Sequence, residues 1–360
     1  MTRKPKIATV DLFCGVGGLT HGLKKAGIKV RAGIDLDTSC KYAYEANNKA
    51  KFIGEDISKI NGDDLTKFWK QDEIKVLVGC APCQPFSSHS NKIKNKESGD
   101  KWNLLNEFLR IAEETNPSVI SMENVPNLSN KDVFTNFVCK LKELGYNVSF
   151  KNVYCPDYGI PQKRRRLVLL ASKLGEIFLI PPTHKPENYI TVKEAISHLE
   201  KIESGEKSNN DKLHFTTKLT DINLKRMKAS IPNGSWEDWS EDLRLNCHKK
   251  QTGKTYKSVY GRMSWDEPSP TITTQFYNYG TGRFGHPEQD RALTVREASI
   301  LQSFPEDYKF YEKETDIFLT KIGTHIGNAV PVKLGYIIGK SIIKHLKTTN
   351  HEQLHIQHFT

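Results

Sequence analysis

Short apolar runs alternate with amphipathic segments over the first half of the chain. The apolar runs end at small or polar residues, as buried strands do, and the segments between them repeat apolar residues at helical spacing. Alternating strands and helices are typical of an α/β domain built on a doubly wound, mostly parallel sheet. The pattern predicts strands at 7–13, 30–34, 76–79, 118–122, 148–154 and 167–171, and helices at 19–26, 41–47, 104–115 and 134–144.

The pattern changes near Pro182, beyond which regular periodicity is lost to about residue 287. This stretch is polar and irregular, and residues 203–212 have the composition of a mobile loop. Helical spacing returns at 293–301, where Thr294 is a suitable N-cap, and again at 332–346. We therefore predict a first domain at 1–175, a smaller inserted domain at 176–289, and a C-terminal segment at 290–360 that returns to the first domain.

Composition narrows the class of protein. A chain of 360 residues suffices for one large domain or two ordinary ones. The net charge of +11 fits a polyanionic partner such as nucleic acid, although a Lys-rich composition alone would produce the same value. No apolar run is long enough to span a bilayer, and the first apolar run is too short for a signal peptide, so we expect a cytoplasmic protein without a membrane partner.

The seven cysteines do not suggest a disulfide framework, because their number is odd and no export signal precedes them. Cys80 and Cys83 form a Cys-x-x-Cys pair. No second such pair and no His-x-x-x-His completes a tetrahedral zinc site, so we predict no metal. A redox pair remains the weaker alternative to a nucleophile at Cys83, with Cys80 as a bystander at a strand end.

A glycine-rich turn, Gly15-Val16-Gly17-Gly18, follows the first predicted strand and opens the first helix. Glycines there let a ligand approach the backbone and the free N–H groups of the helix. Roughly 20 residues later the second strand ends at Asp35, the position that binds ribose hydroxyls in such folds. The spacing departs from Gly-x-Gly-x-x-Gly, which favours an adenosine-bearing ligand other than a dinucleotide.

Asp56 is expected to follow a further short strand between those at 30–34 and 76–79, and it is suited to accept from an adenine amino group, with Ile57 against the ring. The alternative for Asp56 is a helix N-cap, which is the commoner use of an aspartate in this context.

Cys83 lies just past a strand end in a loop stiffened by Pro82 and Pro85, which makes it a candidate nucleophile. Glu123 follows another strand and is expected at the same carboxyl edge of the sheet, where it could carry a proton for a substrate ring. A solvated loop acid or an N-cap is the alternative for Glu123.

A basic cluster, Gln162-Lys163-Arg164-Arg165-Arg166, precedes a further strand. Strand alternation points Arg164 and Arg166 to the same side, so both are predicted to face one cleft. The alternative is a solvated or phosphate-binding face.

Six segments together resemble the motifs of the cytosine-5 DNA methyltransferase family of the bacterial restriction-modification type, in order and over nearly the whole chain. Leu36 departs mildly from the family, since many members carry an aromatic residue there. The segments are Asp11-Leu12-Phe13-Cys14-Gly15-Val16-Gly17-Gly18, Pro82-Cys83-Gln84, Glu123-Asn124-Val125, Gln162-Lys163-Arg164-Arg165-Arg166, residues 291–297 and Gly327-Asn328-Ala329-Val330.

The resemblance implies a Rossmann-like class I methyltransferase fold with S-adenosylmethionine as methyl donor. It assigns these residues to the donor site: Phe13, Gly15, Gly17, Gly18, Leu19, Asp35, Leu36, Asp56, Ile57, Pro82, Leu104 and Asn328.

The resemblance also implies a reaction on a cytosine flipped out of the duplex. Cys83 would attack carbon 6, Glu123 would act at ring N3, and Arg166 would hold O2 and orient Glu123, with Arg164 completing the catalytic set. Contacts to the substrate or DNA are expected from Gln84, Ser87, Asn124, Val125, Gln162, Thr271 and Thr273.

Residues 176–289 correspond to a target-recognition domain, whose basic and aromatic content suits phosphate anchoring and base-edge contacts in double-stranded DNA. We interpret residues 291–297 as an organising helix without a direct catalytic role. By analogy the protein is a monomer that modifies the site of a cognate restriction endonuclease without binding it.

The sequence disfavours two alternative functions. An RNA cytosine-5 methyltransferase of this family would have a reduced recognition region, whereas about 110 residues, an ordinary size for a compact domain, are available here. A non-catalytic DNA-binding relative would be expected to lack the nucleophile or Glu123, and the chain has both.

Overall fold

The structure, a computed structural model, describes residues 6–82, 103–250, 256–314 and 318–357. The chain divides into two compact units. The sheet unit comprises Met1–Tyr154, Arg165–Pro182 and Val330–Thr360, and the second unit comprises Cys155–Arg164 and Thr183–Ala329. This division differs from the predicted domain boundaries, because residues 155–164 and 290–329 group with the second unit.

The sheet unit is built on a seven-stranded sheet of order β3-β2-β1-β4-β5-β7-β6. The first five strands along the chain pair in parallel, while β7 runs antiparallel to both β5 and β6. The predicted mostly parallel α/β sheet is therefore confirmed, with one reversed strand. The strands are β1 (Ile7–Leu12), β2 (Lys29–Ile34), β3 (Lys51–Ile53), β4 (Ile74–Gly79), β5 (Val119–Asn124), β6 (Asn147–Tyr154) and β7 (Arg165–Ser172).

The strand order changes direction between β1 and β4, since β2 and β3 lie on one side of β1 and the later strands on the other. In open α/β sheets the carboxyl ends of the strands at such a switch point form the ligand-binding crevice. The loops after β1, β2, β4 and β5 are therefore the ones to inspect for a site.

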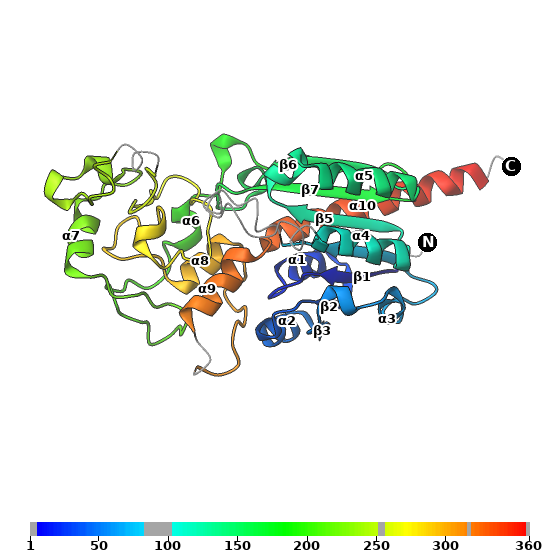
Figure 1. The fold of residues 1–360 in the computed structure, drawn as a ribbon, viewed down its shortest axis with the longest axis horizontal. Helices are drawn as coiled ribbons and strands as arrows, with labels where there is room; N and C mark the ends of the chain where they lie inside the picture. Colours follow the sequence, from blue (N-terminus) through cyan, green and yellow to red (C-terminus); the bar gives the residue numbers. More distant parts are fainter. Residues whose placement is uncertain (1–5, 83–102, 251–255, 315–317, 358–360) are drawn as a thin grey trace. The chain divides into compact units, whose positions relative to one another are not determined.

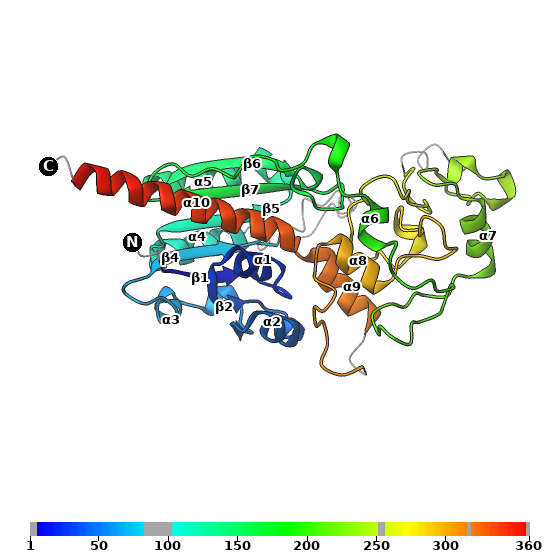
Figure 2. The same ribbon diagram turned by 180° about the vertical axis from the view of Figure 1, so that it is seen from behind.

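Helices cover both faces of this sheet. Figure 1 shows α4 and α5 over one face, and Figure 2 shows α10 running across the opposite face. Phe108 of α4 and Phe137 of α5 meet edge to face in the core beneath them, with ring centroids 5.8 Å apart. The helices of this unit are α1 (Gly18–Ala26), α2 (Lys41–Asn48), α3 (Gly62–Thr66), α4 (Asn103–Thr115), α5 (Asp132–Glu143) and α10 (Val332–Gln357).

Two glycines let α1 and α10 approach closely. A Cβ at Gly22 would lie 2.1 Å from the Val332 carbonyl oxygen, and one at Gly335 would lie 2.7 Å from the Leu19 carbonyl oxygen. The end of the chain is thereby packed against the helix that follows the glycine-rich turn.

The second unit is largely irregular chain around short helices. Its core includes Trp236 and Trp239, which are 3% and 2% exposed, and the ring of His248 stacks on Trp236 at a centroid distance of 4.2 Å. These tryptophans belong to the aromatic content that the sequence interpretation assigned to DNA contact, but their burial gives them a packing role. The helices are α6 (Val192–Ile196), α7 (Asp221–Ala229), α8 (Val295–Leu301) and α9 (Leu319–Asn328).

Candidate active site at the carboxyl edge of the sheet

The turn between β1 and α1 has an unusual backbone. Phe13, Gly15 and Gly17 have φ angles of 59°, 50° and 89°, a left-handed conformation that glycine adopts readily and phenylalanine only at a cost. A Cβ at Gly15 would meet no atom within 4 Å, so the turn borders open space. Gly18 and Leu19 begin α1, which places free backbone N–H groups beside that space.

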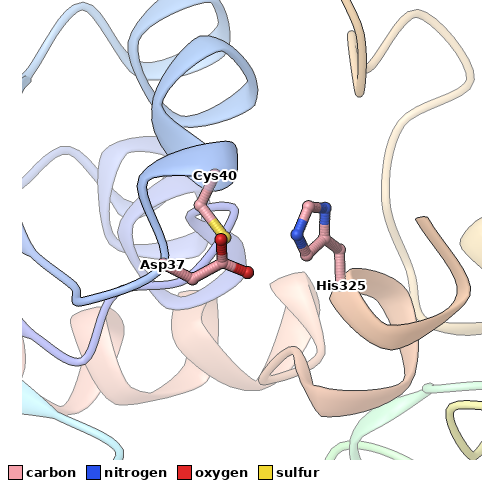
Figure 3. Close-up of side chains that lie close together, drawn as sticks. All are labelled: Asp37, Cys40 and His325. Atoms are coloured by element: carbon pink, nitrogen blue, oxygen red, sulfur yellow. The ribbon is translucent and has the colours of Figure 1, made fainter. Parts of the chain in front are cut away.

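Asp35 braces this turn from the end of β2. Its carboxylate accepts hydrogen bonds from the backbone N–H groups of Gly15, at 2.7 Å, and Asp37, at 2.9 Å. Asp37 in turn caps the short 3₁₀ helix η1 (Thr38–Cys40), and Figure 3 shows its side chain close to that of Cys40. Leu36, between the two aspartates, exposes 70% of its surface.

Asp56 caps the 3₁₀ helix η2 (Ile57–Lys59), where its carboxylate accepts from the Ser58 N–H at 3.0 Å and hydroxyl at 2.9 Å. The backbone hydrogen bond from Ser58 lowers the pKa of Asp56. The N-cap alternative is thus what the structure shows, and contact with an adenine stays a prediction. Ile57 is 3% exposed within the core, with half-buried Leu104 packed against that core.

Arg110 of α4 holds this second turn in place. Its guanidinium donates to the carbonyl oxygens of Ile57, at 2.9 Å, and Ile60, at 3.0 Å. Asp35 therefore fixes the loop after β2 by accepting from backbone N–H groups, and Arg110 fixes the turn after β3 by donating to backbone carbonyl oxygens.

Asp11 lies fully buried in β1, beneath the glycine-rich turn. Thr20 donates to its Oδ2 at 2.6 Å and also contacts the Tyr44 hydroxyl at 3.1 Å. Burial raises the pKa of Asp11 to about 7. Sequence reasoning assigned Asp11 no role, although a single acid within an apolar strand was a visible signal.

These features fit an adenosine-bearing methyl donor. The open space at Gly15, the N–H groups at the start of α1 and the carboxylates of Asp35 and Asp56 offer the donors and acceptors that ribose and adenine require.

Glu123 is the next-to-last residue of β5, and only 2% of its surface is exposed. Arg166 of β7 places Nε 2.9 Å from Glu123 Oε1 in an ion pair. On the other side, the Cys80 thiol donates to Glu123 Oε2 at 2.7 Å. Cys80 was expected to be a bystander at a strand end; the structure adds a contact with Glu123, which the register of β4 and β5 makes possible.

Asn124 fixes the loop that follows β4. Its Nδ2 donates to the Ala81 carbonyl oxygen at 3.0 Å, while its own Oδ1 accepts from the Val125 N–H at 2.8 Å. Pro82, which follows Ala81 in the chain, is exposed. The predicted nucleophile Cys83 and the predicted DNA contacts Gln84 and Ser87 lie outside the described residues.

Arg164 and Arg166 do not share surroundings, contrary to the alternation argument. Arg164 precedes β7, belongs to the second unit and is 3% exposed, and its guanidinium donates to the carbonyl oxygens of Ile272, at 3.0 Å, and Gly327, at 3.2 Å. These contacts tie segments of the second unit together, whereas Arg166 pairs with Glu123.

Gln162 has a similar structural position, since it is fully buried. Its amide donates to the Leu301 carbonyl oxygen at 3.1 Å and accepts from the Ile272 N–H at 2.9 Å, so its polar groups are engaged within the protein rather than presented to DNA. Thr271 and Thr273 are half-buried, and Asn328 is exposed at the end of α9.

Arg291 and Glu297 form a buried ion pair in the second unit. Arg291 makes two contacts with the carboxylate, at 2.9 and 2.7 Å, and Glu297 also closes a capping box with Thr294 at the start of α8. Burial alone would raise the pKa of Glu297, but Arg291 lowers it to about 2. This network supports the interpretation of residues 291–297 as organising rather than catalytic.

A family model described as C-5 cytosine-specific DNA methylase matches residues 7–344. The chain belongs to this family. The methylase therefore transfers a methyl group from S-adenosylmethionine to carbon 5 of cytosine in DNA.

Known relatives span nearly the same length as this methylase. It is 52% identical to the type II methylase M.HgiDII of Herpetosiphon aurantiacus, over 96% of this chain and 98% of the relative. It is 32% identical to the type II methyltransferase M1.HphI of Haemophilus parahaemolyticus, over 93% and 86%. Its fold is similar to that of an Entamoeba histolytica methyltransferase, with a TM-score of 0.59 and 15% identity over 95% of this chain and 99% of the other.

None of the helices in the described part of the methylase is long and apolar enough to cross a membrane.

Proposed function

We propose that the methylase acts through a covalent bond between Cys83 and carbon 6 of a cytosine flipped out of duplex DNA. The observation that carries this proposal is the buried Glu123 carboxylate paired with Arg166 at the sheet edge, beside the loop that leads to Cys83. Asn124 ties that loop to β5 through Ala81, two residues before the predicted nucleophile.

The chemistry requires these groups because carbon 5 of cytosine is a poor nucleophile. Addition of the Cys83 thiolate to carbon 6 makes carbon 5 enamine-like, and a proton or hydrogen bond from Glu123 at N3 stabilises the charge that develops on the ring. Arg166 orients Glu123 and holds the cytosine O2. S-adenosylmethionine, when bound, supplies an electrophilic methyl group to carbon 5. Loss of the carbon 5 proton and elimination of Cys83 then restore the aromatic ring.

For the donor, we propose that the turn at Phe13, Gly15, Gly17, Gly18 and Leu19 and the carboxylates of Asp35 and Asp56 bind the methyl donor. Support comes from the left-handed backbone at Gly15 and Gly17 and from the position of Asp35 after β2, beside the switch point, with Asp56 after the neighbouring strand β3. The remaining predicted donor contacts are Leu36, Ile57, Pro82, Leu104 and Asn328.

We propose that the substrate is a specific duplex sequence and that the protein is the modification enzyme of a type II restriction-modification system. The names of the two bacterial relatives and the net charge of +11 support this assignment. Residues 176–289 would read the sequence, and the protein would act as a cytoplasmic monomer on a site shared with a cognate endonuclease that it does not bind.

Mapping of the methylated positions tests this proposal. Incubation with S-adenosylmethionine and plasmid DNA, followed by bisulfite sequencing, should place 5-methylcytosine at one recurrent sequence. Methylation scattered without a common sequence would contradict a modification enzyme, and transfer to RNA with none to duplex DNA would contradict the proposed substrate.

A further inference from the structure

The register of the sheet brings Cys80 beside Glu123. Gly79, the last residue of β4, pairs with Met122 of β5, so the next residues on the two chains are Cys80 and Glu123. In a parallel pair, neighbours at this offset project to the same face of the sheet. The 2.7 Å hydrogen bond from the Cys80 thiol to Glu123 Oε2 follows from that geometry.

Glu123 is therefore contacted at both carboxylate oxygens, by an ion pair without hydrogen-bond geometry at Oε1 and by a hydrogen bond at Oε2. Arg166 contacts Oε1 from β7, and Cys80 contacts Oε2 from the end of β4. Within the described part of the chain these are the ionisable side chains that contact the carboxylate, one from each neighbouring strand. The terminal torsion of a carboxylate is broad and roughly two-fold, so the directional hydrogen bond from Cys80 restricts its plane more than the ion pair with Arg166 does alone.

We propose that Cys80 is a positioning residue for methyl transfer, which fixes the plane of the Glu123 carboxylate through its thiol. This inference rests on the proposed role of Glu123 at ring N3. Because Cys80 is half-buried and Glu123 is 2% exposed, water has little access to replace the thiol as a donor.

A thiol suits this task because it is a weak hydrogen-bond donor. It can orient the carboxyl group without competing strongly with ring N3 for that group. A hydroxyl at the same position would keep the orientation, whereas a methyl group would remove it and leave Oε2 buried without that donor.

The test compares Cys80→Ala with Cys80→Ser in steady-state methyl transfer to duplex DNA. We expect Cys80→Ala to lower kcat by about tenfold, the scale of one ordinary hydrogen bond, with KM for DNA nearly unchanged. Cys80→Ser should restore most of kcat. Cys139→Ala, the same change at an exposed cysteine on α5, should match the unaltered enzyme.

Equal losses in the Ala and Ser variants would overturn the inference, because only the packing of sulfur would then matter. A kcat for Cys80→Ala within twofold of the unaltered enzyme would overturn it as well.

Glu123→Gln separates this inference from the proposed function. If Glu123→Gln is nearly inactive while Cys80→Ala is fully active, only the role of Cys80 is wrong. If Glu123→Gln keeps full activity, the proposed role of Glu123 is itself wrong.

Discussion

At the scale of single residues, the site depends on buried polar groups, each of which contacts a specific partner within the protein. Glu123 and Asn124 are 2% and 3% exposed, and each uses its polar atoms on a neighbouring strand or loop. A buried polar group left without a partner costs more free energy than its hydrogen bond contributes, so each pair restricts the position of the loop it touches.

Asn124→Ala should uncouple the loop after β4 from β5. The loss of the hydrogen bond to the Ala81 carbonyl oxygen is expected to lower kcat on the order of tenfold, since small displacements of a reacting group have large effects on rate. The free energy of unfolding should fall by only about 1 kcal/mol. Initial rates of methyl transfer and thermal unfolding measure the two effects.

Asn127→Ala, at an exposed position of the next turn, is the matched control and should leave both quantities unchanged. A normal rate for Asn124→Ala would show that the Ala81 contact does not position the loop.

Prediction of single site residues from the sequence succeeded where the proposed chemistry requires a particular residue type. It failed where the contacts of a side chain depend on the tertiary structure. Glu123 and Arg166 were identified together, and the structure pairs them. Arg164 was expected to join them because alternation was extended to a residue that precedes β7, where strand geometry does not apply. The Cys80 contact depends on the β4–β5 register, which periodicity does not contain.

At the scale of elements, helix and strand positions followed the apolar pattern closely. The predicted helix at 19–26 is α1 (Gly18–Ala26), and α5 ends at Glu143, just before Gly145 with its φ of 87°. The reversal of β7 was not predicted because apolar spacing carries no information on strand direction. Helix α9 was missed because two glycines interrupt its short sequence.

The loop predicted at 203–212 also differs from a free loop. Ser208 is 2% exposed and donates to Glu200, and Asp211 pairs with Arg296 of α8. Its polar composition resembles that of disordered segments, but Ser208 has a partner eight residues away and Asp211 one far along the chain, which composition does not reveal.

The close approach of α1 and α10 gives a prediction for stability. Gly22→Ala would place a Cβ 2.1 Å from the Val332 carbonyl oxygen, so the helices must separate. We expect a loss of about 1–3 kcal/mol in the free energy of unfolding, read as a lower Tm.

Lys25→Ala, at an exposed position of the same helix, should change stability by less than about 0.5 kcal/mol. Equal Tm values for Gly22→Ala and Lys25→Ala would contradict the packing described for α1 and α10.

At the scale of the whole molecule, the two units use charge differently. The sheet unit carries Glu123, Arg166 and the glycine-rich turn, while the second unit buries ionisable groups as structural supports. The sequence resemblance predicts that residues 176–289 recognise the target sequence, but it does not assign base-reading side chains. Two of the aromatic residues in that range, Trp236 and Trp239, are core residues.

The buried charges of the second unit predict how stability depends on pH. Burial lowers the pKa of His286 from 6.5 to about 4, and its Nδ1 already accepts the N–H groups of Glu288 and Gln289. As pH decreases, the unfolded chain therefore protonates His286 at a higher pH than the folded protein does. The free energy of unfolding should fall as pH decreases from 6.5 to 4. Around the ring, Glu297 raises this pKa while Arg291 and Arg262 lower it.

Thermal unfolding across that range measures the effect, with His286→Gln as the comparison. The variant lacks the titrating group, so its Tm should fall less between pH 6.5 and pH 4. Parallel Tm curves for the two proteins would show that His286 does not contribute to the acid sensitivity.

The most direct test of the account is the 5-methylcytosine content of duplex DNA after incubation with S-adenosylmethionine, measured for the unaltered methylase and for Cys83→Ala. The account predicts 5-methylcytosine with the unaltered protein and none with Cys83→Ala, while duplex binding is retained. Formation of 5-methylcytosine by Cys83→Ala at the unaltered rate would contradict the role of Cys83 as the nucleophile.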